Sequence, residues 1–224
     1  MKGKLILAGA MFATALVGCN SGSSGPDEED QCGGTGSSVF DITGFNLGEF
    51  KAENNNVDEF VSTEYDGAEP IPYQTLVLQL KADTQSVAQV SAPNFQFSLI
   101  SSAYACSPTL PFTNENITDI NITSSAAFSD DLPAGSNLND VFDVVYIGLE
   151  YRNQVAYGTL DNGEKDYFSI SEFLEIEQRE AGKVIQLALN SEPSYKQNHV
   201  FYIEVSLDTG EQFLLESQEL SFAE

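Results

Sequence analysis

The chain has 224 residues, 42% of them hydrophobic, and its 34 Asp and Glu against nine Lys and Arg give a formal net charge of −25. This charge repels phosphate backbones, so it excludes nucleic-acid binding, and it disfavours docking of the protein surface on anionic lipid. The hydrophobic fraction is sufficient for one large domain with a core.

The N-terminus has the anatomy of a lipoprotein signal peptide. Lys2 and Lys4 precede a charge-free run from Leu5 to Val17, which is shorter than the about 17 to 25 residues that a membrane-spanning helix needs. The run ends in the letters LVGC at 16–19, which resemble the lipobox read by lipoprotein-processing enzymes. We therefore expect residues 1–18 to be removed and Cys19 to carry the acyl chains that anchor the protein in the membrane. The alternative is a soluble secreted protein whose Cys19 lies in the signal by chance.

Processing would divide the chain into three parts. Removal of residues 1–18 takes two basic residues and no acid, which leaves 34 acidic residues against seven basic ones, a formal charge of −27. Residues 19–38 are rich in Gly, Ser and acids, so they predict a flexible, solvated tether. Residues 39–224 form the expected single domain. Asn20 after the cysteine favours the outer membrane as the destination, facing the periplasm or the cell surface.

Two cysteines remain after lipidation, Cys32 and Cys106. In an oxidising envelope compartment such a pair predicts a disulfide, and two free thiols are the alternative.

From residue 39 onward the hydrophobic residues mostly recur with a period of two, which is typical of strands with one buried face. Clear alternations lie near 75–81, 95–99, 120–122, 185–189, 201–207 and 213–215, and further strands are expected near 39–47, 143–151 and 154–160. Tight turns are expected at 208–211, which predicts a closing β-hairpin, and at 161–163. About eight or nine short strands indicate an all-β fold, an antiparallel two-sheet β-sandwich of immunoglobulin-like or jelly-roll-like type.

Two short helical pieces interrupt the strands. Residues 171–179 contain good helix formers, with Ser171 as the expected N-cap and Gly182 as the expected stop. Leu138, Val141 and Phe142 predict one helical turn.

Four segments resemble a known family. These are 97–112 (FSLISSAYACSPTLPF), 117–124 (ITDINITS), 131–143 (DLPAGSNLNDVFD) and the closing 199–213 (HVFYIEVSLDTGEQF). They are similar to segments of uncharacterised bacterial envelope lipoproteins of Bacteroidetes type. The resemblance implies the same class of protein and implies no activity.

The sequence carries no motif of nucleophilic catalysis. Its one His, His199, stands where a polar strand-end residue is expected, and no G-x-S-x-G elbow occurs. We therefore do not expect an enzyme. The alternative that stays open is a secreted glycan hydrolase with paired carboxylates, which the many acids would allow.

We expect no cofactor. Calcium is the better metal candidate, because Ser129–Asp140 places many oxygen ligands around a glycine. The candidate ligands are Asp130, Asp131, Asn137, Asn139 and Asp140. The segment lacks EF-hand spacing, and the simpler interpretation is a turn whose side chains hydrogen-bond to their own backbone.

Sugar binding is a further possibility, through the tyrosines at 146, 151, 157 and 167, for which packing is the alternative. The sequence therefore predicts a lipid-anchored structural or binding module of the envelope, with an envelope protein or a glycan as the possible partner.

Overall fold

The alternating segments of the sequence form β-strands in a computed structural model that describes residues 39–87, 113–149, 152–155, 157–159, 165–176 and 181–223. All of these belong to the compact unit Thr35–Glu224. The strands are β1 (Val39–Asn56), β2 (Glu59–Glu64), β3 (Leu76–Val87), β4 (Ile117–Ser124), β5 (Phe142–Leu149), β6 (Arg152–Val155), β7 (Tyr157–Thr159), β8 (Lys165–Ser169), β9 (Val184–Leu189), β10 (Phe201–Leu207) and β11 (Gln212–Glu216). The expected strand at 95–99 and the turn at 161–163 lie outside the described residues.

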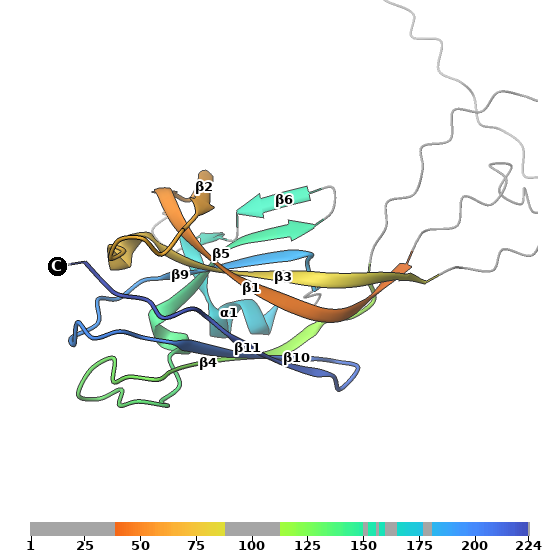
Figure 1. The fold of residues 1–224 in the computed structure, drawn as a ribbon. Helices are drawn as coiled ribbons and strands as arrows, with labels where there is room; N and C mark the ends of the chain where they lie inside the picture. The colour runs from red at the N-terminus through yellow and green to blue at the C-terminus, as the bar shows by residue number, and fades with distance from the viewer. Residues whose placement is uncertain are drawn as a thin grey trace, which may run out of the picture. The chain divides into compact units, whose positions relative to one another are not determined.

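The strands form two sheets of unequal size, which lie as two layers (Figure 1). The large sheet has eight strands in the order β2-β1-β3-β9-β5-β8-β7, with β6 also paired to β5. The small sheet has three strands in the order β11-β10-β4. All pairings between these described strands are antiparallel, and the isolated bridge between Ile71 and Phe222 is parallel. The fold is thus an all-β, two-sheet sandwich, as the sequence predicts.

The core lies between the facing surfaces of the two sheets. β10 buries every second residue, beginning with Phe201, and β4, β3 and β9 contribute the same kind of alternating surface. Phe142 of β5 meets Phe201 edge-on, with ring centroids 5.5 Å apart, so this contact joins the layers directly. Because a buried aliphatic or aromatic side chain contributes about 1.5–3 kcal/mol, this alternating surface holds the sandwich together.

The helical pieces are shorter than expected. Helix α1 covers Ile170–Glu175 and lies between the layers, where Ile170 and Phe173 are buried (Figure 1). Its N-cap is Ser169, not Ser171, because Ser169 and Glu172 form a reciprocal capping box. The helix ends at Glu175, well before Gly182, because Ile176 is already extended. The expected turn near 138–142 is a 3-10 turn, η2 (Asn139–Val141), and another, η1 (Tyr73–Thr75), precedes β3.

No helix within the described ranges is long and apolar enough to cross a bilayer.

The outer face of the large sheet carries a second, smaller cluster. It is built on Val77 and Val145, both fully buried, and Phe60 of β2 meets Tyr167 of β8 with ring centroids 6.2 Å apart. Gln186 of β9 donates from Nε2 to Ser62 Oγ of β2 over 3.0 Å. Since β2 and β8 lie near opposite edges of the sheet, the large sheet curls over its own outer face.

His199 stands just before β10, as the sequence predicts, but its side chain lies in the core and not in the polar setting expected of a strand end. Its side chain is fully buried among Phe128, Phe201 and Phe222, and its Nδ1 lies 2.8 Å from Ser124 Oγ. Ser124 Oγ also accepts from the Ala126 amide over 3.3 Å, so this hydroxyl links the imidazole to the backbone. The buried Nε2 makes no hydrogen bond of normal geometry with the described residues. Burial lowers the pKa of His199, and a weaker interaction with the Tyr195 backbone opposes this shift.

This lowered pKa predicts a pH-dependent stability. Below the unfolded-state pKa of about 6.5, the unfolded chain binds a proton that folded His199 takes up only at lower pH, so stability falls as pH falls through this window. We compare the wild type with a Ser124→Ala/His199→Phe double variant, in which Ser124→Ala removes the hydroxyl that would otherwise lose its imidazole partner. Between pH 8 and pH 5, the free energy of urea unfolding should fall by more in the wild type than in this variant. Equal pH dependence in both proteins would contradict this account of His199.

Candidate functional site

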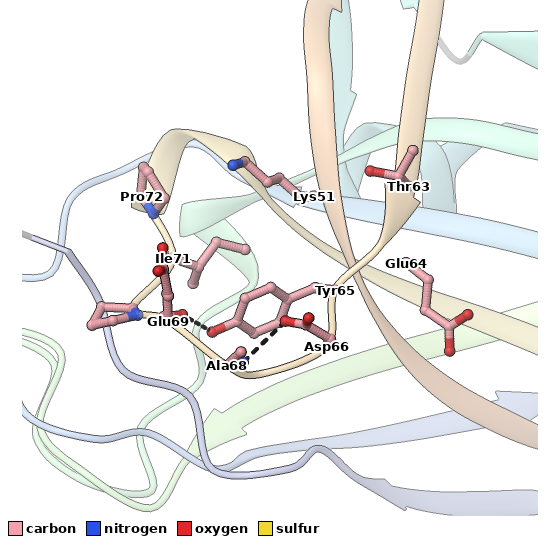
Figure 2. A pocket seen from close by; sticks show the side chains of 10 residues that line it. Lys51, Thr63, Glu64, Tyr65, Asp66, Ala68, Glu69, Ile71 and Pro72 are labelled. Carbon is pink, nitrogen blue, oxygen red and sulfur yellow. Dashed lines mark hydrogen bonds between the residues drawn. The ribbon is translucent and has the colours of Figure 1, made fainter.

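A hollow of about 370 Å³ opens beside β2, where the chain leaves the large sheet for η1 (Figure 2). This volume falls within the range of about 300–1,000 Å³ typical of small-molecule sites. Its floor includes Ile71, which is buried, and the half-buried side chains of Tyr65 and Pro72. The rest of the lining is exposed: Lys51, Thr63, Glu64, Asp66, Ala68, Glu69 and Pro70.

The loop that forms the hollow is tied to itself. The Tyr65 amide donates to the Glu49 carbonyl over 2.9 Å, and the Tyr65 hydroxyl donates to the Glu69 carbonyl. The Ala68 amide donates to Asp66 Oδ1 over 3.0 Å, across Gly67, whose φ of 73° favours glycine. Figure 2 shows the Tyr65 ring in the middle of this loop with its hydroxyl toward Glu69. The hollow is therefore preformed.

The C-terminal segment supports the loop from behind. The Ile71 amide donates to the Ser221 carbonyl, and the Ala223 amide donates to the Ile71 carbonyl, both over 2.9 Å. On the other side, Thr75 donates to the Pro72 carbonyl from both its amide and its hydroxyl, each over 2.9 Å. These bonds fix the Pro70–Pro72 stretch, so a ligand would meet a wall that is already ordered.

The charge of the hollow is mixed but mainly negative. Three acidic residues, Glu64, Asp66 and Glu69, line the hollow together with one basic residue, Lys51, and the Glu64 carboxylate points away from the Tyr65 ring (Figure 2). Burial raises the pKa of Tyr65, and the charges of Asp66 and Glu69 raise it further, so its hydroxyl stays protonated. Such a surface can accept hydrogen bonds from hydroxyl or amino groups and stack an apolar face on Tyr65, and it disfavours polyanions.

The proposed calcium ligands Asn137 and Asn139 are used in hydrogen bonds. Asn139 Oδ1 accepts from the Ile122 amide over 3.0 Å, and Asn139 Nδ2 donates to the Ile120 carbonyl over 2.7 Å. Asn137 Oδ1 accepts from the Asn139 amide over 2.9 Å. The Asn139 side chain thus pairs with the outer edge of β4 as the peptide group of a neighbouring strand would. Asn137 and Asn139 both hydrogen-bond to backbone groups, which agrees with the simpler interpretation of this segment as a turn.

The three acids of this segment are exposed. Asp130 accepts a hydrogen bond from the Tyr195 hydroxyl, and the Asp140 carbonyl lies 3.5 Å from Asn190 Nδ2. Among the described residues, no three His, Cys, Asp or Glu side chains come together as a metal site would require. Calcium binding through Asp130, Asp131 and Asp140 stays a prediction of the sequence.

Two of the four tyrosines considered for sugar binding pack against the second cluster on the outer face of the large sheet. Tyr146 and Tyr167 are both half-buried there, and Tyr157 lies opposite Tyr167 in the β7–β8 pairing. Burial, with the charges of Asp143 and Asp166, raises the pKa of Tyr167 to about 12. These contacts fit packing better than an exposed platform. Tyr151, Cys19, Cys32 and Cys106 lie outside the described residues.

The residues that line the hollow form no recognisable motif in the sequence, so the sequence did not predict this site. Lys51 comes from β1, Thr63 from β2 and Ile71 from the loop, and their proximity depends on strand pairing. The one local signal is the run from Asp66 to Pro72, where Gly67 and two prolines indicate an ordered turn.

The Asn139 contacts lead to a test that separates a structural role from calcium binding. Asn139→Ala leaves the Ile122 amide and the Ile120 carbonyl without their partner, so we expect a loss of about 1–3 kcal/mol in the free energy of unfolding. Asn137→Ala, at an exposed site two residues earlier, should cost less. Urea unfolding with calcium and with EDTA checks both variants. An Asn139→Ala defect that disappears in EDTA would contradict the structural role and indicate a metal site.

The chain matches no protein-family model, no curated protein and no solved structure.

Proposed function

We propose that this protein is a lipid-anchored module of the bacterial cell envelope, held at the outer membrane through Cys19, and that it binds a ligand or partner without transforming it. The observation that carries the proposal is the N-terminal sequence: a basic start, a charge-free run too short to span a bilayer, and the letters LVGC at 16–19. The acidic Gly/Ser stretch at 19–38 would hold the domain away from the membrane.

The high negative charge supports an anchor made of lipid. The processed chain would carry −27, which repels an anionic membrane surface. Single acyl chains give only marginal membrane binding, whereas the two or three chains of a lipoprotein give stable anchoring. A disulfide between Cys32 and Cys106 would additionally tie the tether to the domain in an oxidising compartment.

Binding is favoured over catalysis by the character of the hollow. A general acid in a glycan hydrolase needs a carboxyl group whose pKa is raised by burial or by a neighbouring charge. Glu64, Asp66 and Glu69 are all exposed, so the hollow offers accepting oxygen atoms without a water-free setting for proton transfer. The glycan hydrolase is the second candidate, because three acidic residues line one hollow.

The chemistry of the hollow restricts the ligand class. The acidic residues, the one lysine and the Tyr65 ring suit a neutral or positively charged group with several hydroxyl or amino hydrogens, such as a neutral sugar unit. Phosphorylated and strongly acidic ligands are disfavoured.

The anchor is tested by changing the residue that would carry it. Cys19→Ala should block lipidation and processing, so the variant should accumulate as a larger precursor, and globomycin should accumulate a precursor of the wild type. Membrane fractionation and intact-mass measurement check this. Wild-type protein recovered as soluble periplasmic material with its signal removed normally would show that the lipoprotein proposal is wrong.

A further inference from the structure

The two edge strands of the small sheet, β4 and β11, differ in how their outward backbone groups are hydrogen-bonded. On the β4 edge, outward backbone groups are satisfied by the loop that follows: Asn139 serves Ile120 and Ile122, and the Gly135 amide donates to the Ser124 carbonyl over 2.8 Å. A second amide, that of Leu138, donates to the Ile122 carbonyl over 2.7 Å. This edge is closed to a further strand.

The β11 edge is open. The Leu207 amide donates to Glu211 and the Ser217 amide to Phe201, so the alternation of an antiparallel pair directs the backbone groups of Phe213 and Leu215 toward β10. The backbone groups of Gln212, Leu214 and Glu216 therefore point away from β10. Within the described part of the chain, β11 pairs with β10 alone. β11 thus presents free donors and acceptors along its outer side, the usual template for strand addition.

An apolar side chain stands in the middle of this open edge. Leu214 is 75% exposed, more than any other large hydrophobic residue in the described ranges. It lies on the outer face of the small sheet, beside Glu204 of β10, with Tyr202 and Glu216 paired in the neighbouring row. The exposed Leu214 and the half-buried Tyr202 therefore offer apolar surface that a partner could cover.

The charge around this edge has one sign. The strands of the small sheet contain Asp119, Glu204 and Glu216 and no Lys or Arg, and the β10–β11 turn adds Asp208 and Glu211. Because the chain as a whole carries −25, a second copy approaching this edge would meet strong repulsion. Charge complementarity therefore selects a basic occupant.

We propose that β11 is a docking edge for an extended, Lys- or Arg-rich segment of another protein, which adds as a fourth strand to the small sheet. The partner's alternate apolar side chains would cover Leu214, and its basic side chains would face Glu204 and Glu216. This interaction is separate from the hollow and from the lipid anchor, and it goes beyond the function proposed above.

The test uses the protein as the cell makes it, isotope-labelled, in nonionic detergent and 0.15 M salt. The probe is a ten-residue peptide of alternating lysine and valine with blocked ends. Amide chemical shifts report where the peptide binds and how tightly. We expect the largest changes at Gln212, Leu214 and Glu216, and none of similar size along β4.

Matched variants separate strand addition from attraction by charge. Leu214→Thr keeps strand propensity and removes the apolar anchor, so it should weaken binding by about tenfold. Val61→Thr makes the same kind of change on β2, an edge strand of the other sheet, and should leave the dissociation constant within about twofold. A peptide with alternate backbone nitrogens methylated, equal in charge but unable to pair along one edge, should not bind β11.

Three results would overturn the proposal. Equal binding of the methylated peptide would mean attraction by charge alone. Shifts of β11 amides that depend on protein concentration instead of peptide would identify a second copy as the occupant. If the peptide leaves the β11 amides unchanged and the spectra show contacts between the outer edge of β11 and another segment of the same chain, that segment is the occupant.

Discussion

The burial of one face of the small sheet against the large sheet is the interaction on which the rest of this structure depends. A sheet with one apolar face has to bury that face against another layer, so β4, β10 and β11 need the large sheet opposite. The contact between Phe142 and Phe201 lies in this interface, and His199 is buried against the same aromatic group. The C-terminal segment leaves the small sheet at β11 and then supports the loop of the hollow through Ile71. The candidate binding site is therefore held in place by the same core.

The edges of a sheet this small need separate treatment, because unpaired strand edges invite association. At β4 the chain uses a polar side chain in place of a strand: Asn139 supplies one acceptor and one donor to the backbone. An acidic, asparagine-rich segment that has the composition of an ion site thus has a structural use. At β11 no equivalent closure exists within the described residues, and the negative charges around Leu214 are the remaining protection against self-association.

Strands with a strong period of two could be predicted from the sequence, as could the strands near 39–47 and 143–151, which overlap β1 and β5. The pattern at 201–207 is unambiguous, and it forms β10 with its hairpin to β11. β2 was not predicted, because its polar residues occur on both faces, as is usual at a curled sheet edge. Val77 breaks the alternation of β3, and its burial in the second cluster follows from the curl of the large sheet, which no local pattern specifies. The hollow was missed for the same reason, since strand pairing brings Lys51 to the loop after β2.

The start of α1 could have been predicted from the sequence, because Ser169 stands three residues before Glu172, the spacing of a capping box.

The central claim is that the small sheet is packed on one face, closed at the β4 edge and open at the β11 edge. Native-state hydrogen exchange of the Ile122 and Leu214 amides tests this claim most directly. The Ile122 amide donates to Asn139 Oδ1, and the Leu214 amide points away from β10. The account predicts that Ile122 exchanges only through larger openings of the domain, whereas Leu214 exchanges at nearly the rate of an unstructured peptide. Protection of Leu214 comparable to that of Val205, in the centre of β10, would contradict it, because β11 would then already be paired on its outer side.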